Sequence, residues 1–168
     1  RQQEVRDIGK QQKIISAKDK VIENINAWDD VGQVVVLGDI VADLGTEKEY
    51  VDAAQYFSKL NKPISFITGN HDYLYEDALS PEGKRVRAEA AGRNKKLDKF
   101  KETFKMPELF YSQKVGNYLL VFLSVDSLES RYLAQISENQ LSWLRTELKN
   151  NADSPTIIFF HAPLNGTV

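Results

Sequence analysis

Five residues of this chain have side chains suited to metal binding or acid–base chemistry, and they are grouped at three points in the sequence. They are Asp39, Asn70, His71, Asp72 and His161, and these two histidines are the only ones in the chain. Each group directly follows a short apolar, β-branched segment typical of a buried strand. Because open α/β sheets bind ligands beyond the carboxyl ends of their strands, we expect these side chains to meet in one crevice. Such a combination is what a hydrolytic metal site requires.

The chemistry of each side chain suggests a separate role. The Asp39 carboxylate is a hard oxygen ligand for a divalent cation and is able to bridge two ions. Asn70 offers an amide oxygen to a metal and an NH2 group to a substrate oxygen. His71 is suited to giving a proton to a leaving group, and Asp72 is a candidate to hold the His71 imidazole in one tautomer. His161 is a candidate metal ligand.

Each of these residues also has a purely structural interpretation. Gly-Asp pairs often begin a loop after a strand, an Asn-His turn can carry a structural histidine, and a histidine after an apolar strand often packs in the core. The four-residue run Gly69-Asn70-His71-Asp72 favours the functional interpretation most strongly. The position of His161 at a third strand end adds to it.

The elements that must position these residues follow an α/β pattern. Hydrophobic periodicity predicts helices over 10–28, 47–60, 84–105 and 137–150, and strands over 33–38, 63–68, 111–115, 118–125 and 155–160. Capping-box patterns begin the helices after Thr46 and Ser137. We expect residues 73–83 to form a loop that ends at a helix start, and Gly92 to interrupt the helix that follows. The first strand–helix–strand unit predicts parallel pairing with a right-handed crossover.

The composition limits the classes of function. With 168 residues and 42% hydrophobic residues, the chain has the size of one domain and can bury a core. A net charge of −2 and the lack of an overall basic stripe disfavour nucleic-acid binding, and with it a nuclease. The longest apolar stretch is too short to span a bilayer. The absence of cysteine excludes disulfides and thiolate chemistry. A plain nucleotide-binding domain is disfavoured because no glycine-rich phosphate loop follows a strand. The sequence leaves the cellular compartment and the oligomeric state of the protein open.

Residues 84–105 are rich in lysine and arginine. A solvated helix face is the favoured interpretation. The functional alternative is a cap that steers a phosphorylated substrate, with Arg85, Arg87 and Arg93 as the candidates. Tyr73 and Tyr75 either line the substrate entrance or pack within their loop.

The motifs Gly38-Asp39, Gly69-Asn70-His71-Asp72 and His161-Ala162-Pro163, in this order, resemble the calcineurin-like metallophosphoesterase superfamily, which includes purple acid phosphatases, phosphodiesterases and exonucleases. Residues 118–126 and 140–144 are similar to its secreted-phosphatase-like branches. The resemblance extends from residue 34 to residue 167 and implies a four-layer α/β/β/α sandwich with two metal ions between the sheets. It implies that Asp39 bridges the ions, that Asn70 and His161 bind the second ion, and that His71 stabilises the transition state or protonates the leaving alkoxide.

The chain departs from the family pattern in three places. The opening Asp-x-His motif is absent, with Asp7-Ile8-Gly9 interpreted as surface, and the closing Gly-His-x-His motif is absent. We therefore expect residues 1–168 to be a single metallophosphoesterase domain that lacks the first strand and the C-terminal part. Ala42 occupies the last position of the family's Gly-Asp-x-x-Asp motif, which leaves the role of the next residue, Asp43, open.

The resemblance implies a metal-dependent phosphoesterase that hydrolyses a phosphomonoester or phosphodiester by attack of a metal-bound hydroxide. The substrate would be a phosphorylated small molecule, and the two ions would be divalent or trivalent Mn, Fe or Zn. The isolated 168-residue segment would be inactive if both end motifs are needed. The alternative is a non-catalytic binding module that retains the fold.

Overall fold

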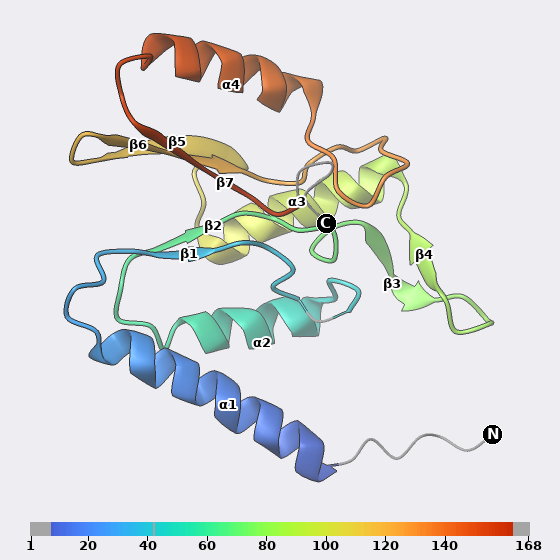
Figure 1. The fold of residues 1–168 in the computed structure, drawn as a ribbon. Coiled ribbons are helices and arrows are strands. Elements are labelled where there is room, and N and C mark those ends of the chain that lie inside the picture. The colour runs from blue at the N-terminus through green and yellow to red at the C-terminus, as the bar shows by residue number, and fades with distance from the viewer. Residues whose placement is uncertain (1–7, 42, 163–168) are drawn as a thin grey trace.

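The computed structural model describes residues 8–41 and 43–162 (Figure 1). The elements in chain order are α1 (Ile8–Ala27), β1 (Val34–Val36), α2 (Glu47–Phe57), β2 (Ile64–Phe66), β3 (Tyr75–Leu79), β4 (Arg85–Arg87), α3 (Ala90–Phe104), β5 (Phe110–Val115), β6 (Tyr118–Leu123), α4 (Glu138–Asn150) and β7 (Thr156–Phe160).

The elements form the expected α/β layers. The strands β1 and β2 pair in parallel, and a second sheet has the order β5-β6-β7, with β5 antiparallel and β7 parallel to β6. In Figure 1, α4 covers the outer side of the three-stranded sheet, the two sheets lie next to each other, and α2 lies beyond β1 and β2 with α1 outside it. The order helix, sheet, sheet, helix is the α/β/β/α sandwich that the family resemblance implies.

The side chains of β6 point alternately to the two faces of its sheet, and both faces of this strand are packed. Leu119, Val121 and Leu123 point to one face and pack against Trp143 and Leu144 of α4. On the opposite face, the Phe122 ring stacks between rings from the neighbouring strands β5 and β7. A strand with apolar residues on both faces is buried from both sides, as its unbroken apolar sequence predicts.

A separate cluster joins the β1–β2 sheet to its helices. Its buried members are Val41, Tyr50, Phe66 and Phe100, which come from the loop after β1 and from α2, β2 and α3. Tyr50 and Phe100 meet edge to face with their ring centroids 6.3 Å apart. The cluster fixes α2 and α3 against the strands whose ends carry the candidate site.

The two sheets are joined by hydrogen bonds where β2 and β6 end. The Thr68 hydroxyl donates to the Val125 carbonyl at 2.6 Å, and the Val125 N–H donates to the Thr68 carbonyl at 3.1 Å. The Thr68 N–H in turn donates to the Ser124 hydroxyl at 3.0 Å. All three residues are buried, so these bonds link the sheets in a place that water does not reach.

Both helix starts that the capping patterns predict are found. Thr46 caps α2 in a complete capping box with Glu49. At α4, the Ser137 side chain accepts from the Gln140 N–H, but the Ser137 N–H donates to the Asp126 carboxylate at 2.6 Å. At α4 the acceptor of the N-cap N–H is thus a buried aspartate from the loop after β6, whereas at α2 it is the glutamate in the first turn of the helix itself.

The segment between β2 and α3 differs from its prediction. Residues 75–87 form an antiparallel hairpin of β3 and β4, where we expected a loop and the start of a helix. Pro81 lies in the hairpin turn, where the Gly83 N–H donates to the Ser80 carbonyl at 2.8 Å and Gly83 has a φ of 76°. The helix begins only at Ala90 and runs through Gly92 without interruption, since a single glycine is tolerated within a helix that packs against its neighbours.

The other predicted elements are confirmed within a few residues of their bounds. Across residues 8–41 and 43–162, we find no helix whose length and apolar character would let it cross a membrane.

Candidate functional site

The site begins at a strained turn after β1. Asp39 has a φ of 52° and the preceding Gly38 a φ of 87°, both in the left-handed region. Aspartate tolerates this conformation better than most residues, and such backbone strain is common at functional sites. The turn directs the Asp39 carboxylate toward the end of β2, where its Oδ1 accepts the His71 N–H at 2.9 Å.

The end of β7 brings His161 to the same place. Its Nδ1 lies 2.7 Å from the Leu37 carbonyl oxygen, and its Nε2 lies 3.5 Å from Oδ2 of Asp39. Because a carbonyl oxygen only accepts hydrogen bonds, Nδ1 carries a proton and Nε2 is the nitrogen that faces the carboxylate. A backbone carbonyl that accepts from one ring nitrogen and leaves the other free to bind a metal is the usual arrangement of a metal-binding histidine.

Asp39 and His161 shift each other's titration. The hydrogen bond to the Asp39 carboxylate raises the pKa of the His161 imidazole, against the opposing effect of burial. Burial raises the pKa of Asp39, but the hydrogen bonds with His161 and from the His71 N–H together hold that pKa below its ordinary value. Each group therefore favours the charged form of the other, and a metal ion at Nε2 would compete with a proton for that nitrogen.

Gly69 makes the close approach of the two strand ends feasible. A Cβ atom on Gly69 would lie 2.3 Å from Oδ1 of Asp39 and 2.6 Å from Cε1 of His161. The space that a side chain would fill is thus the space between the two candidate ligands. Asn70 follows directly, half-buried, in the turn that leads to His71.

Asp72 does not orient the His71 ring in this structure. Its fully buried carboxylate accepts the Asp39 and Gly69 N–H groups on Oδ2 and the Ile40 and Val41 N–H groups on Oδ1, at 2.7–3.2 Å. Burial raises the pKa of Asp72 to about 6, although the hydrogen bonds from Gly69 and Val41 act in the opposite direction. Asp72 therefore joins the loop after β1 to the loop after β2, because the amide groups of these loops need a buried acceptor.

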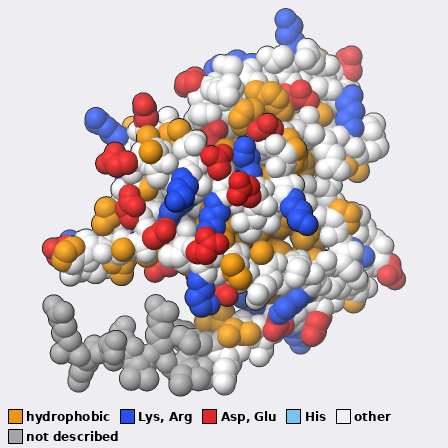
Figure 2. All heavy atoms as spheres, turned by 180° about the vertical axis from the view of Figure 1, so that it is seen from behind, with side chains coloured by type: hydrophobic (Ala, Val, Ile, Leu, Met, Phe, Trp, Pro, Cys, Tyr) orange, Lys and Arg blue, Asp and Glu red, His pale blue; other side chains and the backbone are white. Residues whose placement is uncertain are grey.

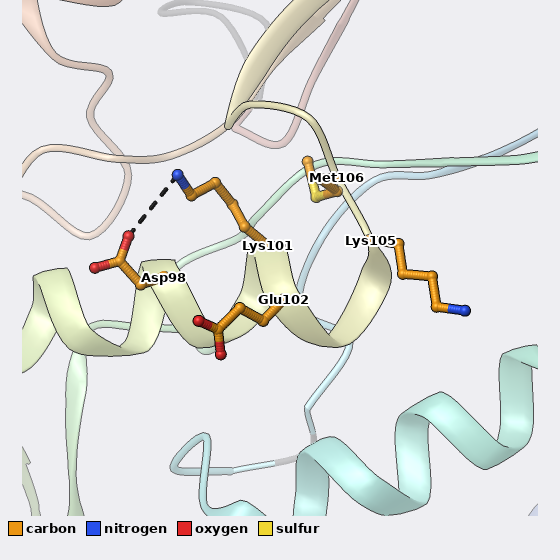
Figure 3. Close-up of a pocket in the computed structure, with 5 residues that line it drawn as sticks. All are labelled: Asp98, Lys101, Glu102, Lys105 and Met106. Atoms are coloured by element: carbon orange, nitrogen blue, oxygen red, sulfur yellow. Dashed lines mark ion pairs between the residues drawn. The ribbon is translucent and has the colours of Figure 1, made fainter.

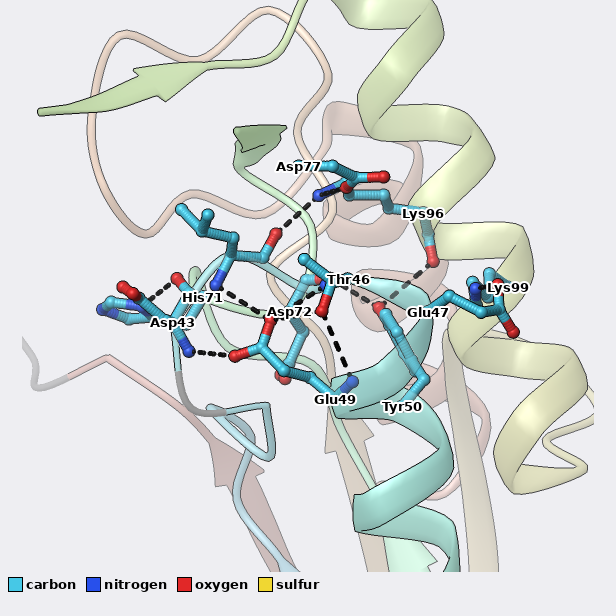
Figure 4. Close-up of polar contacts among 11 residues, drawn as sticks. Asp43, Thr46, Glu47, Glu49, Tyr50, His71, Asp72, Asp77, Lys96 and Lys99 are labelled. Atoms are coloured by element: carbon cyan, nitrogen blue, oxygen red, sulfur yellow. Dashed lines mark hydrogen bonds and ion pairs between the residues drawn. The ribbon is translucent and has the colours of Figure 1, made fainter. Parts of the chain in front are cut away.

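The His71 ring is oriented instead by a main-chain carbonyl. Its Nδ1 lies 3.1 Å from the carbonyl oxygen of Asp43, which leaves Nε2 as the nitrogen available to a substrate. The Tyr75 ring lies beside it, with the centroids 5.4 Å apart. Asp43, whose role the sequence left open, thus acts through its backbone (Figure 4).

The residues that were candidates for substrate contact differ in their exposure. Arg93 is buried, and its guanidinium donates to the carbonyls of Ala88, Leu128 and Ser130, so it belongs neither to the solvated helix face that we favoured nor to the alternative, a substrate-steering cap. These three carbonyls lie just before α3 and in the loop after β6, and together they hold the guanidinium inside the protein. Tyr73 is also buried and packs against Leu97 and Val125, as loop packing predicts.

Arg85 and Arg87 lie on β4 and are exposed. Arg85 pairs with the Asp43 carboxylate at 2.6 Å, whereas Arg87 donates to the Arg131 carbonyl at 2.5 Å. On the face shown in Figure 2, acidic and basic side chains are interspersed rather than gathered by sign. Such a face lacks the continuous positive field that nucleic-acid binding requires.

The donor set fits part of a metal site. Asp39 Oδ2 and His161 Nε2 are close enough to bind one ion, and oxygen and imidazole donors suit Mn, Fe or Zn. Within residues 8–41 and 43–162, however, no group of three or more His, Asp and Glu side chains is gathered around a common point. The described part of the chain thus offers one carboxylate–imidazole pair, with Asn70 adjacent in sequence, and not two complete ligand sets.

Two surface cavities differ in their relation to this pair. One of about 500 Å³ lies at the end of α3, is lined by charged side chains and Met106, and is remote from both histidines (Figure 3). The other, of about 390 Å³, reaches Asp39 between β1 and the helices α1 and α2. Its lining residues are Lys18, Val36, Gly38, Asp39, Ile40, Glu49, Asp52, Ala53, Tyr56 and Phe57. The second cavity therefore touches Asp39, but its lining includes neither histidine.

Comparison with known families agrees with this geometry. The model of the calcineurin-like phosphoesterase family matches residues 8–167, and the chain belongs to that family. This membership agrees with the α/β arrangement of the described residues.

A curated relative shows a more distant similarity. The chain is 28% identical over 132 residues, or 77% of its length, to the glycerophosphodiester phosphodiesterase GpdQ of Enterobacter lignolyticus (strain SCF1). The match covers 41% of that protein, so the chain corresponds to less than half of the relative's length.

Proposed function

We propose that the protein is a metal-dependent phosphoesterase that hydrolyses a phosphomonoester or phosphodiester of a small molecule. The observation that carries the proposal is the meeting of Asp39 and His161 at the ends of β1 and β7, beside His71, in a chain of the calcineurin-like phosphoesterase family. The name of the curated relative, a glycerophosphodiester phosphodiesterase, supports a diester as the first substrate to test.

In this proposal Asp39, His161 and Asn70 hold the metal, and the Leu37 carbonyl keeps the His161 ring turned toward it. Bound ions of this kind polarise a phosphoryl oxygen and lower the pKa of water. With its Nδ1–H donating to the Asp43 carbonyl, the His71 imidazolium gives its Nε2 proton to the departing alkoxide and is left as the neutral ring. Asp72 has a positioning role, since it holds the loops that carry Asp39 and Asn70.

One observation favours a second candidate, a binding module that retains the fold without catalysis. Within the described residues, the acidic and imidazole side chains do not assemble a cluster of three. If the remaining ligands are not supplied elsewhere in the whole protein, the pair would bind metal weakly and the fold would serve recognition.

The test uses the full-length protein with added Mn²⁺. We expect bound metal and hydrolysis of p-nitrophenyl phosphate or bis-p-nitrophenyl phosphate, both lost in Asp39→Asn. His71→Ala should lower turnover about 10²- to 10⁴-fold, the usual effect of removing a general acid, with little loss of metal. Asp153→Asn, an exposed position in the turn after α4, is the matched control for the loss of one carboxylate.

The outcomes separate the two candidates. Absence of both metal and turnover in the parent protein would contradict the phosphoesterase proposal and leave the binding module. Equal turnover in His71→Ala and the parent would remove His71 from the mechanism.

A further inference from the structure

The loop that carries the His71 partner is held by charged side chains from three different elements. Glu49 of α2 accepts the Asp43 N–H at 2.7 Å and the Leu44 N–H at 3.2 Å. Lys96 of α3 donates to the Leu44 carbonyl at 2.5 Å. Arg85 of β4 donates from Nε and Nη2 to Oδ1 of Asp43 at 2.7 and 2.6 Å. Figure 4 shows Glu49, Asp43, His71 and Lys96 around this loop.

The three contacts are not equivalent. Glu49 and Lys96 bind main-chain groups from the half-buried and buried side of the loop, so they also support the fold of α2 and α3. Arg85, on the exposed strand β4, makes its hydrogen bonds with this loop through the Asp43 side chain rather than through the main chain. It is therefore the contact that can be removed with the least effect on the rest of the structure.

Arg85 reaches the His71 ring by two routes. Through Asp43 it fixes the residue whose carbonyl lies 3.1 Å from Nδ1 of His71. Its guanidinium carbon also lies 5.6 Å from the centroid of the Tyr75 ring, whose centroid is 5.4 Å from that of His71. The Tyr75 ring thus contacts both the arginine and the histidine, which limits the movement of the imidazole on a second side.

We propose that Arg85 is a positioning residue for His71: it clamps Asp43 and Tyr75 so that the Nε2 nitrogen of His71 faces the leaving group. The inference rests on the proposed function, in which His71 supplies a proton to that group. It gives Arg85 a different role from the one considered in the sequence analysis, where it was a candidate for a cap that steers the substrate.

The size of the effect follows from exposure. The side chains of Arg85 and Asp43 are 45% and 46% exposed, and half-exposed ion pairs contribute at most about 1 kcal/mol. If the whole of that free energy serves to orient the His71 ring, the loss of the ion pair corresponds to about a fivefold decrease in kcat.

The experiment compares two diesters in the full-length protein with Mn²⁺. Diphenyl phosphate has a basic leaving group that needs a proton, whereas bis-p-nitrophenyl phosphate has one that departs with little help. We expect Arg85→Ala to lower kcat about fivefold for diphenyl phosphate, less than twofold for bis-p-nitrophenyl phosphate, and to leave KM and metal content unchanged. Arg85→Lys, which keeps a cation beside Asp43, should recover about half of the loss. Arg87→Ala, on the same strand, is the control and should match the parent.

Three results would overturn the inference. The first is an Arg85→Ala variant that matches Arg87→Ala with both diesters. The second is an equal loss with both diesters, which would indicate general disturbance of the site. The third is a change confined to KM, which would make Arg85 a substrate-binding residue. His71→Ala measured alongside distinguishes the two proposals: if it lowers diphenyl phosphate turnover and Arg85→Ala does not, only the role of Arg85 fails.

Discussion

Replacement of Gly69 by alanine should displace the side chains of both Asp39 and His161. The added Cβ would lie 2.3 Å from Oδ1 of Asp39 and 2.6 Å from both the Asp39 backbone nitrogen and Cε1 of His161. Real Cβ contacts begin near 3.0 Å, so the Asp39 carboxylate must move by about 0.7 Å. The Asp39 backbone cannot yield freely, because its N–H is held by the buried Asp72 carboxylate at 2.9 Å.

Two magnitudes follow from this displacement. Overpacking of a well-packed region costs about 1–3 kcal/mol, which for a chain of this size lowers Tm by roughly 2–12 °C. Misplacement of reacting groups by close to 1 Å costs about 10²-fold in rate. We therefore expect Gly69→Ala to lose most of its metal and about 10²-fold of its turnover, at a modest cost in Tm.

The assay combines thermal denaturation, metal content by elemental analysis and hydrolysis of bis-p-nitrophenyl phosphate in the full-length protein. Gly32→Ala is the control, because a Cβ there meets no atom within 4 Å. Metal content and turnover equal to those of Gly32→Ala would refute the argument that Gly69 provides the space between Asp39 and His161.

Two further predictions concern loops and caps away from the two histidines. Thr46→Ala removes the acceptor of the Glu49 N–H and should lower the free energy of unfolding by about 1 kcal/mol, seen as a lower urea midpoint with an unchanged slope. Burial raises the pKa of Asp126, although hydrogen bonds from Ser137 oppose it, so the folded state holds its proton to a higher pH than the unfolded state. Stability should consequently fall as the pH rises from the ordinary carboxyl pKa of about 3.9 to the raised value. Asp126→Asn can keep both contacts with Ser137 but has no carboxyl proton to lose. In urea titrations at a series of pH values, its free energy of unfolding should therefore fall less than that of the parent over this pH range. An equal fall in the variant and the parent would contradict the prediction.

The sequence predicted the parts of the fold in which local pattern and tertiary burial agree. Val34–Val36 and Thr156–Phe160 are apolar enough to be strands in any context, and Thr46 with Glu49 forms a helix start that needs no distant partner. The hairpin over Tyr75–Arg87 was missed because its strands are mostly polar and exposed. The signal that could have found it is Ser80-Pro81-Glu82-Gly83, in which proline and glycine stand at turn positions rather than at a helix start.

The sequence predicted that Asp39, His71 and His161 lie close together, but not the contacts that they make. The convergence of Asp39 with His71 and His161 follows from strand-end positions alone. The acceptor of the His71 ring does not, because a main-chain carbonyl leaves no signature in the sequence. The Asp72 carboxylate was assigned to that task since it is adjacent in sequence, but adjacent residues in a turn point in different directions. The reach of Glu49 beyond its capping box to the Asp43 N–H likewise needs three-dimensional coordinates.

The hydrogen-bonded seam between Thr68 and Val125 has a consequence for hydrogen exchange. The amide protons of both residues are bonded across the two sheets and are buried, so solvent reaches them only when the sheets separate. Their exchange should therefore report the global unfolding reaction rather than local fraying. Gly69, Asn70 and His71 begin one residue after this seam, so the candidate site is anchored to the most slowly opening part of the molecule.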